Sequence, residues 1–154
     1  MRLSLLAVGT VSGFVEEGFE AYRNRLPPAL RPSVREVVQA SARERASGRA
    51  RAAETRRLLD AAPPGSAIIL LDPGGDLVTT EAWAHRLATY QASSADCAFL
   101  IGGADGLDPE ANSRADWIWS LSPLTFPHAL VRVIWIEQLY RAWTLLSHHP
   151  YHRA

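Results

Sequence analysis

The residues best suited to do chemistry lie in the last third of this 154-residue chain and begin with a glycine turn. The turn reads Gly102-Gly103-Ala104-Asp105-Gly106 and directly follows the apolar pair Leu100-Ile101. Glycines in such a turn permit a positive φ and let a ligand approach the backbone closely. Because open α/β sheets bind ligands where strands end, the turn is a candidate binding site. A tight strand-to-helix turn without a ligand is the alternative interpretation.

The glycine turn does not match the common nucleotide-binding motifs. Its glycines do not follow the order G-x-G-x-x-G, and no acidic ribose ligand stands at the expected spacing, so a nucleotide-binding oxidoreductase is the least favoured function. The chain also contains no Gly-Lys-Ser or Gly-Lys-Thr, which excludes a P-loop. Any ligand of this turn must be recognised in another way.

A second candidate is the loop from Leu121 to Pro127, which is apolar and carries hydroxyl groups on Ser122 and Thr125. Such a loop can form one wall of a pocket for an aromatic ring, with backbone groups reading the edge of the ring. Its two prolines favour an extended backbone, so a buried connection is the alternative. Asp72 ends another apolar run, where it can accept a hydrogen bond from a ligand or cap the following turn.

The C-terminal tail combines polar rings with a guanidinium group, in the segment His148-His149-Pro150-Tyr151-His152-Arg153. An aromatic ring and an arginine suit stacking on an unpaired base and holding a phosphate. His149 and His152 are a weak metal signal, because no cysteine or carboxylate pair is near them, and no metal is expected. Disorder is the alternative for such a tail.

Attraction to nucleic acid would have to be local in this chain. Lysine is absent, and sixteen arginines are balanced by sixteen acidic residues. Residues 41–60 nevertheless hold six arginines against three acidic residues, a local excess of three positive charges. This segment is equally consistent with a contact to RNA backbone and with a solvated helix face.

These segments need a scaffold, and the apolar pattern predicts strands alternating with helices in one α/β domain, residues 1–154, with a mainly parallel sheet. Continuous apolar runs at 67–72 and 98–101 are typical of buried parallel strands, and Pro73-Gly74-Gly75-Asp76 is expected to close the first. Other strands are expected at 3–8, 34–38 and 117–121, and helices at 14–26, 41–62, from Thr80 through Tyr90, after Pro109 and at about 128–147.

The last helix is apolar over much of its surface, so we expect its burial by the sheet and also by a second subunit. Arg132, Glu137 and Arg141 interrupt the apolar surface, where ion pairing and substrate contact both remain open. Cys97 is the single cysteine, which excludes an internal disulfide and fits a reducing compartment. Its apolar neighbours favour a buried thiol over a nucleophile.

No apolar stretch approaches the ~20 residues that span a bilayer, and the N-terminal one is too short for a signal sequence. The sequence therefore predicts a cytoplasmic protein without a membrane contact.

The chain resembles, from end to end, the RlmH family of SPOUT-class methyltransferases. The matching segments are Met1-Arg2-Leu3 with Ala7-Val8-Gly9-Thr10, Leu71-Asp72, Leu100-Ile101-Gly102-Gly103 with Gly106-Leu107, Leu124-Thr125 with Pro127-His128, Leu130-Val131-Arg132-Val133, Glu137 with Leu139-Tyr140-Arg141-Ala142-Trp143, and His149-Pro150-Tyr151-His152-Arg153. Two departures are Ala104, where proline is common, and the arginines of 41–51, where relatives often have lysine and glycine.

The resemblance implies a small SPOUT-type α/β domain with a C-terminal trefoil knot that binds S-adenosyl-L-methionine. It implies a homodimer whose active site uses both chains, with the helix that holds Glu137 and Tyr140 at or near the interface. The implied reaction is methylation of N3 of a pseudouridine in helix 69 of 23S rRNA, in the assembled 70S ribosome.

The resemblance also implies roles for particular residues. Those matching the cofactor-binding pattern are Leu71, Gly102, Gly103, Leu121, Ser122, Pro123, Leu124, Thr125 and Phe126. Those expected near the target base are His128, Arg132, Tyr151, His152 and Arg153. His128 and Arg153 are the candidates for stabilising the developing uracil anion, while either His152 or water can take the proton.

Two other functions are compatible with the same fold. A non-catalytic ribosome-binding or assembly factor would bind the particle without transferring a methyl group, but the intact glycine turn and tail argue against it. A SPOUT enzyme acting on another RNA, such as tRNA, is disfavoured because the chain has no added RNA-binding domain.

Overall fold

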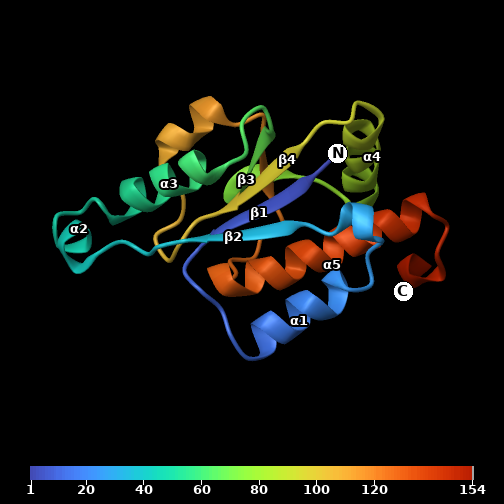
Figure 1. Ribbon diagram of the computed structural model, residues 1–154, viewed down its shortest axis with the longest axis horizontal. Helices are drawn as coiled ribbons and strands as arrows, with labels where there is room; N and C mark the ends of the chain where they lie inside the picture. The colour runs from blue at the N-terminus through green and yellow to red at the C-terminus, as the bar shows by residue number, and fades with distance from the viewer. Residues whose placement is uncertain (154) are drawn as a thin grey trace.

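The computed structural model describes residues 1–153 as one five-stranded parallel sheet with helices on both faces. The strand order is β2-β1-β4-β3-β5 (Figure 1). The strands are β1 Leu3–Val8, β2 Ser33–Val37, β3 Ala67–Leu77, β4 Cys97–Ile101 and β5 Trp117–Ser120. The helices are α1 Phe14–Arg23, α2 Ala42–Ala46, α3 Ala50–Ala61, α4 Thr80–Ala92 and α5 His128–Leu146, with 3-10 turns at Pro28–Leu30, Pro109–Arg114 and Pro150–Arg153.

The alternation of side chains along the three central strands builds two hydrophobic cores. Leu5 and Phe99 point to the face covered by α1, α4 and α5, whereas Leu6 and Leu100 point to the face covered by α3. Successive strand residues point to opposite faces, so a strand buried on both sides must be apolar throughout. The continuous apolar runs at 67–71 and 97–101 therefore indicated the parallel sheet correctly.

Strand β3 is longer than predicted, because it continues through Pro73-Gly74-Gly75-Asp76 instead of closing there. Its pairing with β5 shifts register between Leu71 and Asp76, and Trp119 is the partner of both. A Cβ on Gly75 would lie 2.5 Å from the carbonyl carbon of Ile118, so only glycine allows the two backbones to come this close. The expected turn is thus an irregular part of the strand.

The helix predicted for 41–62 is broken into α2 and α3 at Gly48, whose φ is +73°. Ser41 caps α2 through a capping box with Glu44. The other predicted helices and strands are present, with ends that differ by a few residues. The strand order does not by itself test the trefoil knot, which stays a prediction.

Within residues 1–153, none of the helices combines the length and the apolar character that a membrane crossing requires. Cys97 is a buried free thiol, as predicted, and burial raises its pKa to about 11. A thiol with this pKa is a poor nucleophile at neutral pH.

Candidate active site

A cavity of about 350 Å³ opens at the carboxyl ends of β4 and β5, beside residues 71–73 of β3. Its size is that of a small-molecule site, and apolar side chains and backbone make up most of its wall. Eight of the nine residues assigned to cofactor binding line it: Leu71, Gly102, Gly103, Leu121, Ser122, Leu124, Thr125 and Phe126. Pro123 belongs to the same loop but is not on the wall. His128 also lines the cavity.

The glycine turn is held by its own backbone and leaves no space for a side chain at Gly102 or Gly103. The Gly106 N–H donates to the carbonyl oxygen of Gly103 at 3.0 Å, and Gly106 has a φ of +77°. A Cβ on Gly102 would lie 2.6 Å from the carbonyl carbon of Gly106. The turn is therefore tight, as the alternative interpretation required, and it is also a wall of the cavity.

The opposite wall is the loop that connects β5 to α5. The Ser120 hydroxyl donates to the Ser122 carbonyl oxygen at 3.0 Å, and the Leu124 N–H donates to the Ser122 hydroxyl at 2.9 Å. These bonds fix the loop, while the side chain of Leu124 is 69% exposed at the cavity. Asp72 lines the cavity too, and its carboxylate accepts from the Gly74 N–H at 2.8 Å, which corresponds to capping, one of the two roles that the sequence left open.

His128 stands at the first position of α5 and is half-buried on the cavity wall. Pro127 precedes it and provides no side-chain cap, and the first turn holds no acidic residue. The amide groups at a helix N-terminus carry partial positive charge. The cavity therefore has an imidazole and the positive end of a long helix on one side.

Arg132 is one turn further along α5 but does not line the cavity. Its buried guanidinium donates to the Glu36 carboxylate at 2.8 Å and to the carbonyl oxygens of Val8 and Gly9 at 3.3 and 2.8 Å. This clamps α5 to the ends of β1 and β2. Contact between Arg132 and the target base stays a prediction, and the geometry favours a positioning role.

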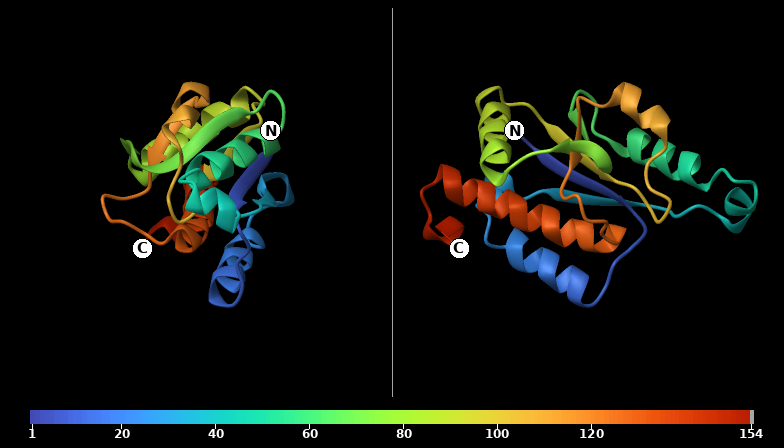
Figure 2. Two further views of the ribbon diagram at one scale, coloured as in Figure 1. Left: turned by 90° about the vertical axis from the view of Figure 1, so that its left-hand side faces the viewer. Right: turned by 180° about the vertical axis from the view of Figure 1, so that it is seen from behind.

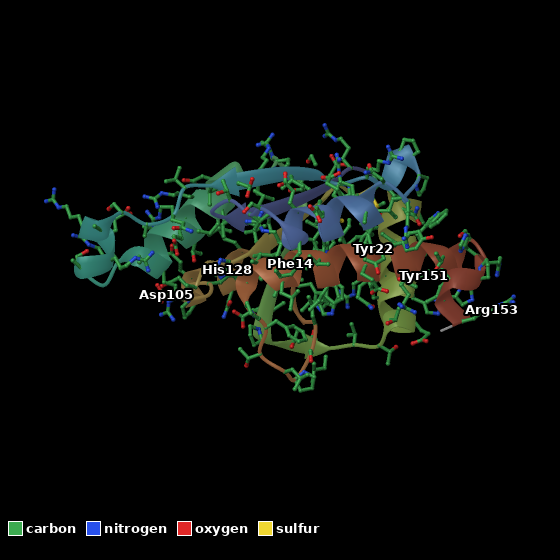
Figure 3. All side chains as sticks on the ribbon, turned by 90° about the horizontal axis from the view of Figure 1, so that it is seen from below. Phe14, Tyr22, Asp105, His128, Tyr151 and Arg153 are labelled. Atoms are coloured by element: carbon green, nitrogen blue, oxygen red, sulfur yellow. The ribbon has the colours of Figure 1, made fainter. Side chains whose placement is uncertain are left out.

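The tail lies at the other end of α5 (Figure 3). Helix α5 has nineteen residues, so its two ends lie roughly 28 Å apart at 1.5 Å per residue. Figure 3 shows His128 at the start of α5 and Arg153 beyond the far end of this helix. Within one chain, the structure therefore does not bring Tyr151, His152 and Arg153 to the cavity that holds His128.

An aromatic cluster fixes the tail on α1 and α5. The Tyr151 hydroxyl lies 3.1 Å from a Glu137 carboxylate oxygen and 3.4 Å from the Tyr22 hydroxyl. The ring of Tyr140 packs edge-on at 4.7 Å between centroids, and the Arg141 guanidinium lies over the Tyr151 ring. Burial, together with the neighbouring Tyr22 and Glu137, raises the pKa of Tyr151. The phenol is therefore neutral at physiological pH.

The two other charged residues of α5 form an ion pair with each other. Arg141 contacts the Glu137 carboxylate at 2.7 Å, one helical turn away, and this contact raises the pKa of Arg141. Arg132, Glu137 and Arg141 are therefore all ion-paired within the chain, one of the two interpretations left open by the sequence. Among residues 1–153 no cluster of potential metal ligands occurs.

Sequence reasoning missed several residues of the cavity wall, including Trp119 and Val131. Trp119 precedes Leu121 by two positions, so the period of a strand places both side chains on one face. That period was the available signal. Val131 follows His128 by one helical turn, and its signal was the helical period.

Comparison with known proteins shows the family to which the chain belongs. Residues 1–152 match the family model described as "Predicted SPOUT methyltransferase". A protein of Paraburkholderia phymatum named "Ribosomal RNA large subunit methyltransferase H" is 46% identical, and the alignment covers both chains completely. Proteins with the same name from Burkholderia ambifaria and Paraburkholderia xenovorans are 44% and 46% identical, also over their full lengths.

Proposed function

The chain belongs to the SPOUT methyltransferase family, and on this basis we propose that it methylates ribosomal RNA of the large subunit. The proposed donor is S-adenosyl-L-methionine, and the acceptor is N3 of a pseudouridine in helix 69 of 23S rRNA, in assembled 70S ribosomes of the cytoplasm. The observation that carries the proposal is the cavity formed by the glycine turn and the 121–126 loop, with His128 on its wall.

The residues around the cavity fit the proposed cofactor. Gly102 and Gly103 keep the wall free of side chains, and Leu71 with the loop from Leu121 to Phe126 supplies an apolar lining. These groups would hold S-adenosylmethionine, which when bound supplies an activated methyl group. The protein is then left to orient the attacking nitrogen and to stabilise the charge that develops on the acceptor.

The start of α5 is suited to stabilise an anion. The uracil N3–H must lose its proton before or during attack, so negative charge develops on the ring. His128 and the uncapped amide groups at the helix N-terminus lie on the cavity wall or next to it, where they can donate to that charge. Arg132 holds this end of the helix in place.

We further propose that the tail acts in the active site of a second subunit of a homodimer. The roughly 28 Å length of α5 separates the tail from the cavity of its own chain, which supports an action of Arg153 in the cavity of another copy. Closed two-fold symmetry would complete both sites at once. Arg153 would then stabilise the uracil anion, and His152 or water would take the proton.

The first experiment measures the transfer of labelled methyl groups to 70S ribosomes, free 50S subunits and naked 23S rRNA, all from a strain that lacks the modification. We expect label in helix 69 of the 70S sample and little in naked RNA. Cofactor binding without label in any sample would refute the proposed substrate and direct the search to other RNAs. Binding to ribosomes without any transfer would support the assembly-factor alternative.

Mixed dimers test the composite site. His128→Ala and Arg153→Ala chains should each be inactive alone. When both are mixed and allowed to exchange subunits, half of the dimers carry one intact site, so about 25% of wild-type activity should return. If the tail acted in its own chain, the mixture would stay inactive, because each chain would carry one damaged component.

A further inference from the structure

The helices α2 and α3 form an arginine-rich arm, residues 42–61, beside the cavity. The arm extends beyond the sheet at the end where α5 begins (Figures 1 and 2). It contains all six arginines of the positively charged segment: Arg43, Arg45, Arg49, Arg51, Arg56 and Arg57. The roles proposed for the cavity and for the tail do not involve this arm.

Two of the three acidic residues of the arm neutralise little of its outer surface, and the third, Asp60, is exposed near the end of α3. Glu44 is occupied by Arg57, whose guanidinium donates to both carboxylate oxygens at 2.7 and 2.9 Å. Glu54 is buried beneath the arm and accepts from the Ala40 N–H at 2.9 Å. Within residues 1–153, Arg43 and Arg49 have no acidic partner within 4.0 Å.

These arginines surround a hollow in the surface. Arg43, Arg49 and Arg56 line it together with Ser47 and with Glu44, whose carboxylate is held by Arg57. The volume of the hollow is about 450 Å³. Guanidinium groups match the geometry of phosphate oxygens and can donate two parallel hydrogen bonds to them. A hollow lined by three arginines is therefore suited to a phosphate of a nucleic-acid backbone.

Three ion pairs join the arm to the glycine turn and to the segment that follows it. Arg45 pairs with Asp105 at 3.5 Å, Arg51 with Asp108 at 3.6 Å and Arg56 with Glu110 at 3.5 Å. The arginine side chains are between 49% and 70% exposed, so each pair contributes little to stability. Phosphate groups can replace these carboxylates at small cost.

Buried contacts keep the two segments together during such an exchange. The Asp108 N–H donates to the Thr55 hydroxyl at 2.8 Å, and Thr55 is fully buried. Glu54 packs so closely on Gly103 that a Cβ there would lie 2.8 Å from its carboxylate oxygen. The arginines can therefore change partners while the arm and the glycine turn stay in place.

We propose that this arm binds the phosphate backbone of the RNA substrate next to the cavity, and that Asp105 and Glu110 occupy two of its arginines until RNA arrives. The inference rests on the proposed action on RNA. It explains how a chain of zero net charge can hold RNA, because residues 41–60 carry a local excess of three positive charges.

The test measures binding of 70S ribosomes and of a hairpin with the helix 69 sequence, between 50 and 200 mM salt. The double variant Arg43→Gln/Arg49→Gln should bind both about tenfold more weakly at 0.1 M salt, and its slope of log K against log salt should be smaller by one to two. The control is Arg2→Gln, whose side chain is 84% exposed at the opposite ends of the strands and which should bind as wild type.

Replacement of the acidic partners gives a second test, in which the affinity for RNA should rise instead of fall. Asp105→Asn/Glu110→Gln should bind RNA about two- to threefold more tightly, because the competing carboxylates are gone. Unchanged affinity and slope in both double variants would overturn the proposal. An equal loss of affinity in Arg2→Gln would overturn it as well. A loss of affinity for ribosomes but not for the hairpin would also overturn it, and would indicate a contact to ribosomal protein instead.

Failure of this proposal can be told apart from failure of the proposed function. Wild-type chain that transfers no methyl group to any ribosomal sample refutes the function, whatever the arm variants bind. If wild type transfers methyl groups, the Arg43→Gln/Arg49→Gln variant should reach wild-type turnover at saturating ribosome concentration and show a raised KM. A lower kcat with unchanged KM would place these arginines in the chemical step and overturn the binding role.

Discussion

Replacement of Arg132 by methionine separates its clamp role from a role in chemistry. Methionine retains much of the length of the side chain but donates no hydrogen bond. The variant leaves the Glu36 carboxylate and the carbonyl oxygens of Val8 and Gly9 without their donor. Removing one partner of a buried ion pair typically costs 3–5 kcal/mol. Because the Glu36 side chain is 34% exposed, we expect about 3 kcal/mol, the lower end of that range.

For a chain of this length, a loss of about 3 kcal/mol lowers Tm by about 6–12 °C. The assay is thermal unfolding followed by circular dichroism, with methyl transfer measured well below the Tm of the variant. The control is Arg2→Gln, an exposed pair with Asp96 whose loss should leave Tm unchanged. An Arg132→Met protein with wild-type Tm and no methyl transfer would refute the clamp and restore Arg132 to the chemical site.

Three further outcomes are expected. Gly102→Ala should reduce cofactor affinity more than tenfold in calorimetry, because its Cβ would lie 2.6 Å from the Gly106 carbonyl carbon. The control is Gly65→Ala, which strains the backbone at a positive φ but places its Cβ in open space, and which should bind the cofactor as wild type does. Removal of residues 150–154 should abolish transfer yet keep cofactor affinity within about twofold of wild type, because no residue of the tail lines the cavity. The pKa of the Cys97 thiol is about 11 in the folded state and near its ordinary value of 9.0 in the unfolded chain. The buried neutral thiol therefore makes its full contribution to stability below pH 9. This contribution is lost as the pH rises to about 11, because the unfolded state then gains from ionisation of the thiol. Urea unfolding should show the stability difference between wild type and Cys97→Ala shrink over that interval; a constant difference would contradict the assigned burial.

The parts of the fold that follow from local patterns were predicted well. The apolar runs at 68–71 and 97–101 are buried on both faces, and that requirement is visible in the sequence. The continuation of β3 through Gly75 could not be predicted from the sequence, because it depends on β5 packing against a residue that has no side chain. The break at Gly48 falls inside the helix predicted for 41–62, because periodicity does not report a single left-handed residue.

The candidate site shows a similar division. Most residues assigned to the cofactor line one cavity, since strand ends in a parallel sheet converge on one edge. The position of Arg132 could not be deduced, because its partner Glu36 is 96 residues away in the chain and belongs to an edge strand. The separation of His128 from Arg153 was implicit in the length of α5, although the sequence alone did not show that the tail packs back on Tyr22 and Tyr140.

The burial of Cys97 makes this protein convenient for spectroscopic labelling. The only native thiol is 1% exposed and has a pKa of about 11, so it reacts slowly with maleimides or methanethiosulfonates at neutral pH. One cysteine introduced at an exposed position therefore receives a spin label or fluorophore without prior removal of the native residue. With one spin label per chain, pulsed electron–electron double resonance reports only distances between copies of the chain. These distances would show whether two copies associate so that the tail of one reaches the cavity of the other.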